Sequence, residues 1–157
     1  MKSRVFPVVL TFLFVIFLSI VSFADSNKDD DGEEAKNELS LFLGATSNSD
    51  GTAFTYGLDY SYRITSFLSI GALIDHAGGD INSTLLGPAA FFHIRNFGIT
   101  TAPALEFSDG GTTFTGRIGL EYEIGLKAFS ISPVVNIDGF RGGEFSVVYG
   151  LGFSIEF

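Results

Sequence analysis

The chain contains no cysteine among its 157 residues. This absence excludes a disulfide framework, a thiolate metal site and an N-terminal lipid anchor on cysteine. Positive charge is also scarce: nine Lys and Arg stand against eighteen Asp and Glu, and the net charge is -9. A net acidic chain that is poor in lysine argues against a nucleic-acid partner.

Residues that commonly carry chemistry are sparse as well. The only two histidines are His76 and His93, and neither forms a histidine pair or a histidine–carboxylate cluster with metal-ligand spacing. No glycine loop of the phosphate-binding kind is present, and the nineteen glycines serve turns and close packing. The sequence therefore predicts no catalytic residue, no metal site and no cofactor.

The N-terminal sequence is typical of an export signal. Lys2 and Arg4 precede an apolar run over residues 5–21, and Ser22-Phe23-Ala24 has the small-x-small form of a cleavage site. An uncleaved anchor helix is the alternative, since the run nears the ~18 residues of a membrane span. The cleavage triplet favours a signal peptide over residues 1–24, and its removal makes the net charge -11.

A strongly acidic segment follows. Seven acidic residues lie between Asp25 and Glu38, against Lys28 and Lys36. We predict that residues 25–37 form a disordered periplasmic tail, because such a charge run cannot bury a core. Calcium binding is the alternative, but the spacing of a calcium-binding loop is absent.

From Glu38 onward the hydrophobic period is two, which is typical of strands. Eight segments of about ten residues are separated by Gly, Asn, Asp and Ser clusters. They run from Leu39 to Thr46, Phe54 to Arg63, Phe67 to Asp75, Thr84 to Ile94, Ile99 to Phe107, Phe114 to Glu123, Phe129 to Asp138 and Tyr149 to Phe157. In the fourth segment both faces are apolar, so its phase stays open.

Eight sequential amphipathic strands predict an all-β fold, an eight-stranded antiparallel up-and-down transmembrane β-barrel over residues 38–157. The polar face consists mostly of Ser, Thr, Gly and Ala, which is too small and too uncharged for the exterior of a soluble barrel. It fits the narrow interior of an eight-stranded barrel. The Phe-, Leu- and Ile-rich face then contacts lipid, and closure leaves no unpaired edge in hydrocarbon.

Aromatic residues sort to the two ends of these strands and predict two aromatic girdles. The outer girdle contains Phe54, Phe107, Phe114 and Phe145, and the inner one contains Tyr62, Phe92, Tyr122, Phe129 and Phe157. The stretch from Phe54 to Tyr62 covers about 27 Å along a strand. A tilt of about 40° reduces this to about 20 Å, close to the apolar band of about 25 Å in such barrels.

Three prolines oppose this interpretation. Pro88, Pro103 and Pro133 lie inside predicted strands, where proline removes a ladder hydrogen bond. We expect bulges or rim positions there.

The last strand ends on an aromatic residue. Its apolar positions alternate up to the final residue of the chain: Tyr149, Leu151, Phe153, Ile155 and Phe157. This ending resembles the assembly signal of bacterial outer-membrane barrels, which the barrel-assembly machinery reads. Together with the strand pattern and the girdles, it makes residues 38–157 similar to the small eight-stranded outer-membrane barrels of the porin family. That group contains structural proteins, small-molecule pores and some lipid-modifying enzymes, so the resemblance implies a fold and a location more than an activity.

Inward-facing charges form the main candidate site. Arg117 lies at mid-strand, with Glu106 on the neighbouring strand and Glu121 further along its own strand; Asp59 and Arg63 also point inward. A polar pathway or gate is one interpretation. We favour an internal ion-pair network that plugs the barrel, because eight strands leave no open channel.

A catalytic alternative lies at the outer rim. Asp75, His76 and Ser83, with Glu144 and Ser146 at the same level, could in principle form a Ser–His–acid site for lipid A. The chain lacks the His-x-Ser spacing shared by the lipid A deacylase barrels. We therefore expect no enzyme, and we interpret His76 as a polar loop residue and His93 as a structural residue near the inner rim.

The sequence thus predicts a non-catalytic integral protein of a Gram-negative outer membrane. Its expected partners are outer-membrane lipid and the barrel-assembly machinery, and its expected role is structural or a minor one in small-molecule passage. Two alternatives remain: an enzyme that modifies lipid in the outer leaflet, and a soluble periplasmic ligand-binding barrel.

Overall fold

The computed structural model describes residues 36–140 and 143–157. The predicted signal peptide and nearly all of the predicted acidic tail lie outside these residues. The described chain forms nine strands: β1 (Asn37–Asn48), β2 (Gly51–Thr65), β3 (Leu68–Ala77), β4 (Ser83–Ile94), β5 (Phe97–Ser108), β6 (Gly111–Tyr122), β7 (Ile124–Gly125), β8 (Ser130–Phe140) and β9 (Phe145–Glu156). Within the described part, no helix is long and apolar enough to cross a membrane.

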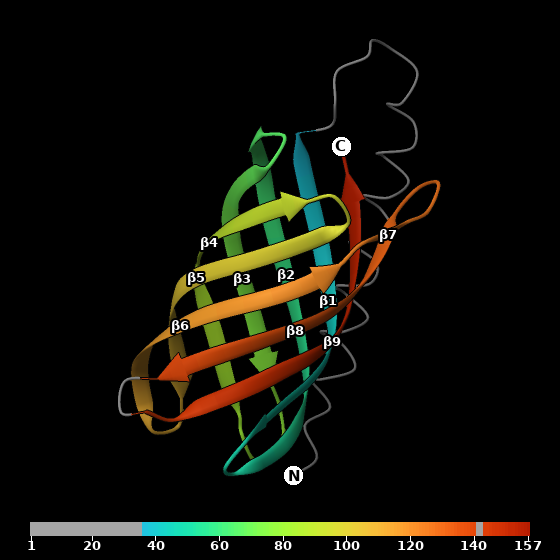
Figure 1. Ribbon diagram of the computed structural model, residues 1–157. Coiled ribbons are helices and arrows are strands. Elements are labelled where there is room, and N and C mark those ends of the chain that lie inside the picture. The colour runs from blue at the N-terminus through green and yellow to red at the C-terminus, as the bar shows by residue number, and fades with distance from the viewer. Residues whose placement is uncertain (1–35, 141–142) are drawn as a thin grey trace.

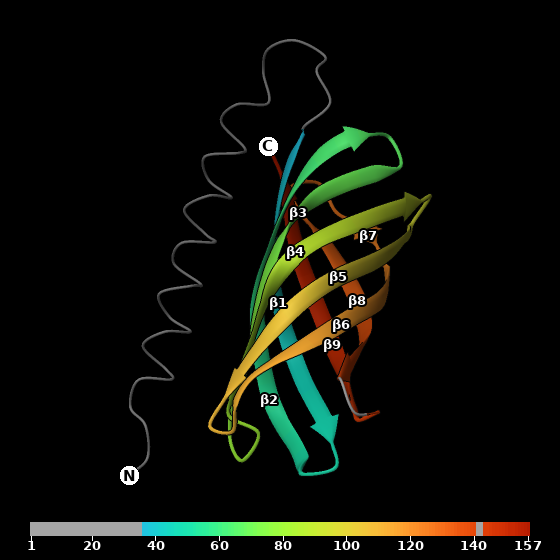
Figure 2. The same cartoon turned by 90° about the vertical axis from the view of Figure 1, so that its left-hand side faces the viewer.

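The strands close into an antiparallel barrel. Sequential neighbours pair from β1 to β6 and from β7 to β9, β6 pairs with β8, and β1 pairs with β9 to close the ring. The two-residue β7 continues β6, because Glu121 faces Val134 and Ile124 faces Ile131 in one unbroken register. The predicted eight-stranded up-and-down barrel is confirmed, and Figures 1 and 2 show its strands inclined to the barrel axis.

The two faces of the barrel differ sharply. Most large apolar side chains that point outward are exposed, for example Ile118 at 58 % and Phe114 at 59 %. Inward positions of the same strand, such as Thr115 and Arg117, are buried. Across the described strands, no outward position carries Asp, Glu, Lys or Arg. A water-facing surface would need such charges, whereas a lipid-facing surface excludes them.

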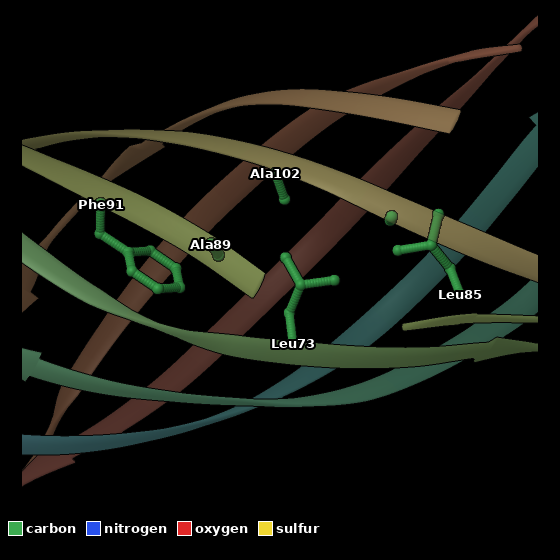
Figure 3. Close-up of a cluster of buried hydrophobic side chains, with 6 residues drawn as sticks. Leu73, Leu85, Ala89, Phe91 and Ala102 are labelled. Carbon is green, nitrogen blue, oxygen red and sulfur yellow. The ribbon is translucent and has the colours of Figure 1, made fainter. Parts of the chain in front are cut away.

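The structure fixes the phase of β4, which the sequence left open. Leu85, Ala89 and Phe91 point inward and are buried, while Leu86 is exposed on the outer face. These inward side chains pack with Leu73 of β3 and with Ala102 and Ala104 of β5. Figure 3 shows this cluster inside the barrel. Apolar side chains from β3, β4 and β5 therefore fill part of the lumen.

The prediction of bulges or rim positions is wrong for Pro88 and Pro103. The β4–β5 register is the same on both sides of the prolines, with Leu86 facing Leu105 and Ala90 facing Thr101. Pro88 and Pro103 therefore stand directly opposite each other, and the ladder lacks pairs over just these positions. Each proline has no N–H to donate to the other's carbonyl, so the ladder opens without a bulge.

Pro133 lies opposite a similar break. It pairs normally with Leu151 of β9, but its other side faces the gap between β6 and β7. A shift of register occurs instead in β2, between Arg63 and Thr65. Opposite Pro133, the unpaired positions separate β6 from β7, whereas the sequence pattern predicted that this strand ends at Glu123.

The start of β1 and the last residue of the chain meet at one rim of the barrel. The backbone N–H of Asn37 donates to the carbonyl of Phe157 (3.1 Å), and the N–H of Phe157 donates to the carbonyl of Asn37 (2.9 Å). Nearby, Arg63 Nη2 lies 2.6 Å from Glu156 Oε1. The last residue of the chain thus takes part in the seam between β1 and β9 that closes the ring.

Candidate functional site

An ion triad lies at the centre of the lumen. Arg117 of β6 donates from Nε to Asp138 Oδ1 (2.6 Å) and from Nη2 to Asp138 Oδ2 (2.8 Å). Its Nη1 donates to Asp75 Oδ2. All three side chains are buried. A two-pronged Arg–carboxylate contact is among the strongest ion-pair geometries, so the guanidinium is held in one orientation.

The triad crosses the barrel. Asp138 of β8 lies directly opposite Arg117 on the neighbouring strand. Asp75 belongs to β3, which is four strands from β8 around the ring. Strands four apart in a ring of eight lie on opposite walls, so the triad connects the two sides of the lumen. Gly57 of β2 faces Asp75, and a Cβ at Gly57 would overlap its carboxylate; only glycine leaves room for Asp75 there.

Two small cavities lie on either side of the triad. One of about 30 Å³ contains Glu38, Asp59 and Glu121 in its lining, and one of about 20 Å³ contains Glu106 and Ser146. Asp75 and Arg117 line both cavities and separate them. A water needs roughly 10–15 Å³ of such space, so each cavity holds one or two waters. We call them the inner cavity and the outer cavity.

The structure distributes the predicted interior charges over three levels. Asp59 and Glu121 lie at the inner cavity, and Glu106 lies at the outer cavity. Arg63 lies at the rim, where it pairs with Glu156. Arg117 is central, as expected from the sequence, but it contacts neither Glu106 nor Glu121 in its ion pairs; its partners are Asp75 and Asp138.

Sequence reasoning missed both partners of Arg117. Asp138 alternates with the same period as Ser130, Ser132 and Asn136, so the sequence pattern predicted that its side chain points inward. The pattern could not predict that Asp138 pairs with Arg117 on the neighbouring strand. The sequence pattern ended the third strand at Asp75 and assigned that residue to the rim. β3 continues to Ala77, which moves Asp75 into the lumen.

The residues of the possible Ser–His–acid site point in different directions. His76 lies on the outward face, where its Nδ1 is 2.9 Å from Thr84 Oγ1 and its ring contacts that of Tyr56 at a tilt of 54°. Ser83 is buried and lines the outer cavity, and Asp75 is engaged by Arg117. His93 points inward, with Nε2 2.9 Å from Ser69 Oγ. Among the described residues no group of three His, Cys, Asp or Glu could hold a metal ion.

The aromatic residues of the predicted girdles lie near strand ends on the outward face. Phe54, Phe107, Phe114, Phe145, Tyr62, Tyr122, Phe129 and Phe157 are exposed, and Phe92 is partly exposed. Phe67 and Phe97 join the inner group, because Phe67 contacts Phe92 (5.8 Å between ring centroids) and Phe97 contacts Tyr122 (5.0 Å). The girdle is thus richer than the sequence pattern indicated.

The predicted assembly strand forms one side of the closing seam. Tyr149, Leu151, Phe153 and Ile155 pair with successive outward residues of β1. Leu41 and Ile155 cluster with Leu39, Leu43, Leu58 and Phe153 on the outward face. Apolar contacts therefore cover the seam from outside, while its backbone ladder runs without a break from Ser47 to Glu38.

No known family model matches this chain, and no curated protein matches its sequence. Solved structures with a similar fold include Neisserial surface protein A (TM-score 0.52, 15% identity, 80% of this chain and 100% of that one). The Yersinia pestis outer membrane protein Ail is also similar (TM-score 0.53, 12% identity, 79% and 100%). A de novo designed transmembrane β-barrel is similar with a TM-score of 0.54 and 11% identity, over 78% of this chain and 98% of the designed one. At these identities the likeness concerns the fold.

Proposed function

We propose that this protein is an exported, integral outer-membrane β-barrel with a structural, non-catalytic role and a lumen that is closed to solutes. The observation that carries the proposal is the ion triad, which connects opposite walls of the barrel at Arg117. The lumen on either side holds only water-sized cavities. An apolar cluster of β3, β4 and β5 side chains fills another part of it.

Three observations support a position in the membrane. The described outward face carries exposed aliphatic side chains and no Asp, Glu, Lys or Arg. Aromatic residues border this face at both strand ends, as in outer-membrane barrels. The fold is similar to that of solved outer-membrane proteins. A soluble carrier barrel would instead place its apolar face inside, around a ligand cavity.

The proposed partners follow from the same surfaces. Lipid contacts the uncharged outward face, and the barrel-assembly machinery binds the last strand, β9, with its terminal Phe157. The close contact of Phe157 with Asn37 explains why an assembly signal would lie here: pairing of these residues completes the ring.

We propose no catalytic role, because His76 and Ser83 face opposite sides of the sheet. The corresponding experiment compares lipid A by mass spectrometry in strains with and without the gene. An unchanged lipid A profile supports the non-catalytic role. A lipid species that disappears on deletion and returns with the wild-type gene would establish the enzyme alternative.

Conductance across a planar bilayer tests the closed lumen. We expect the reconstituted wild-type protein to give no stepwise current, because the triad blocks the path. Arg117→Ser removes the bridge and leaves Asp75 and Asp138 in the lumen, so it is expected to produce a small cation-selective current. Arg63→Ser, which removes a cation at the rim, is the matched control and should stay silent. Regular wild-type channel openings would contradict the proposal.

A further inference from the structure

The lumen contains more buried carboxylates than cations. Asp75 and Asp138 share the single guanidinium of Arg117. Asp59 lies beside them on the wall of β2, two residues from Gly57, which faces Asp75. Asp59 is therefore a third inward aspartate at the triad, and the guanidinium is already engaged by the other two. A buried charge in a protein needs pairing or neutralisation.

One oxygen of Asp59 has no partner. Its Oδ1 is shielded from solvent and makes no hydrogen bond to any residue in the described part of the chain. As an ionised oxygen it lacks a donor, and as a protonated hydroxyl it would lack an acceptor. Either state leaves a buried polar atom unsatisfied, which is unfavourable. Something other than the described side chains must satisfy this atom.

The inner cavity supplies the space for an occupant. Asp59 lines it, together with the hydroxyls of Ser40 and Ser61 and the amide of Asn136. Ser40 stands directly opposite Asp59 on β1. Glu38 and Glu121 line the same cavity. Its volume of about 30 Å³ suits one small ion with a single water.

We propose that the inner cavity binds one small monovalent cation, Na⁺ or K⁺, with Asp59 Oδ1 as its charged ligand. Neutral oxygens of Ser40, Ser61 and Asn136 would complete the shell, since hard cations prefer oxygen ligands. Glu38 and Glu121 also line the cavity, but Asp59 Oδ1 is the buried carboxylate oxygen without a partner in the described part of the chain. With Asp59 as the only charged ligand, a monovalent ion neutralises the site. In the described part of the chain no three acidic or histidine side chains form a metal-binding group.

The bound cation has a structural consequence. It neutralises the carboxylate of Asp59, which Arg117 leaves unpaired. The ion is then the second cation, after Arg117, among the charged groups that close the lumen. Because the ion binds the folded barrel, its concentration adds to stability. At a cation concentration ten times the dissociation constant, the folded-to-unfolded ratio rises about tenfold.

Urea unfolding of the refolded barrel in detergent tests this proposal. The measurement compares NaCl or KCl with N-methyl-D-glucamine chloride at the same ionic strength, so that general screening cancels. N-methyl-D-glucamine is too large for the cavity. We expect Na⁺ or K⁺ to raise the folded-to-unfolded ratio of the wild type at least several-fold over the large cation.

Two variants localise the effect. Asp59→Asn removes the charged ligand, and Ser61→Val fills the cavity while Asp59 stays intact. Both should respond equally to small and large cations. Glu106→Gln, in the outer cavity, is the matched control and should keep the wild-type response. The boiled-versus-unboiled gel shift confirms that each variant is folded, and Ser61→Val still decides the question if Asp59→Asn does not fold.

Three results would overturn the proposal. One is a wild type that is equally stable in small and large cations, with Asp59→Asn of unchanged stability; Asp59 is then a neutral acid and the cavity holds water alone. Another is a cation response that persists in both Asp59→Asn and Ser61→Val, because the ion then binds elsewhere. A response to Ca²⁺ at far lower concentration than to Na⁺ would equally contradict a monovalent site.

Discussion

At the scale of single residues, Arg117 carries most of the interior electrostatics. Its guanidinium satisfies two buried carboxylates on different strands. The pair with Asp138 is two-pronged, which lysine could not reproduce with a single ammonium group. The function of this residue is to keep the charges of the lumen paired.

Replacing Arg117 tests this view. Arg117→Met keeps most of the side-chain volume but leaves Asp75 and Asp138 buried without their cation. Breaking one side of a buried ion pair costs about 3–5 kcal/mol, so we expect a loss of that order in the free energy of unfolding. Urea titration of the refolded barrel, followed by the unboiled gel band, measures it.

Arg63→Met is the matched control. The Arg63–Glu156 pair lies at the rim, with both side chains partly exposed, and such pairs contribute about 0–1 kcal/mol. If Arg63→Met and Arg117→Met lower the free energy of unfolding equally, the central triad contributes no more to stability than the rim pair does.

At the scale of strands, the β4–β5 seam is the weak point of the ring. Pro88 and Pro103 face each other across it, and the ladder is interrupted between Leu86 and Ala90. In hydrocarbon, missing backbone hydrogen bonds are unfavourable. Both prolines point outward and line a groove on the lipid-facing surface, with Tyr62 and Ile70. The barrel therefore tolerates a local defect that closure elsewhere compensates.

Restoring the ladder should stabilise the barrel. Pro88→Val supplies an N–H to the carbonyl of Pro103, and Pro103→Val does the reverse. Each new hydrogen bond is worth about 0.5–1.5 kcal/mol, and the double variant should gain about the sum. Unfolding by urea in detergent measures the gain.

Ala90→Val is the control for the proline variants, because it enlarges an outward side chain of the same strand without adding an N–H. If Ala90→Val stabilises as much as Pro88→Val, side-chain packing rather than the missing hydrogen bond explains the effect.

The last strand combines two features that can be separated. Phe157 contributes its backbone to the seam with Asn37 and its exposed ring to the outward face. Phe157→Ala keeps the backbone contacts and removes the ring, whereas deletion of Phe157 removes both. We expect both variants to assemble poorly in cells, because the machinery would bind the ring.

Refolding in detergent distinguishes the two roles of Phe157. Without the assembly machinery, Phe157→Ala should refold as the wild type does, and the deletion should be less stable. Normal assembly of Phe157→Ala in cells, judged by the unboiled gel band from outer membranes, would count against an aromatic assembly signal.

At the scale of the whole molecule, the architecture was predictable because one periodicity repeats through it. The alternation of apolar and polar residues in the second, sixth and eighth segments predicted that these segments are strands, which side chains point outward, and that the strands form a barrel. The ends of the strands in the structure differ from the predicted ends by only a few residues. β4 was ambiguous because Leu85 and Phe91 fill the lumen with apolar side chains. Where an interior is itself apolar, hydropathy no longer distinguishes inside from outside.

The interior site was less predictable than the fold. Alternation identified Arg117 and Asp59 as inward residues, but contacts across the lumen depend on the register and tilt of strands far apart in sequence. Asp75 reaches Arg117 from a wall three strands away, and nothing in the local pattern of either strand signals that distance. The interruption of the ladder at Pro88 and Pro103 likewise could not be predicted without knowing the register in which β4 pairs with β5.

The central claim is that this barrel has its apolar face in an outer membrane. The most direct measurement is the migration of the protein from isolated outer membranes on a detergent gel, boiled against unboiled. We expect the protein in this fraction, and we expect its folded form to migrate differently until it is boiled. Recovery in the soluble periplasmic fraction, with no shift on boiling, would contradict it.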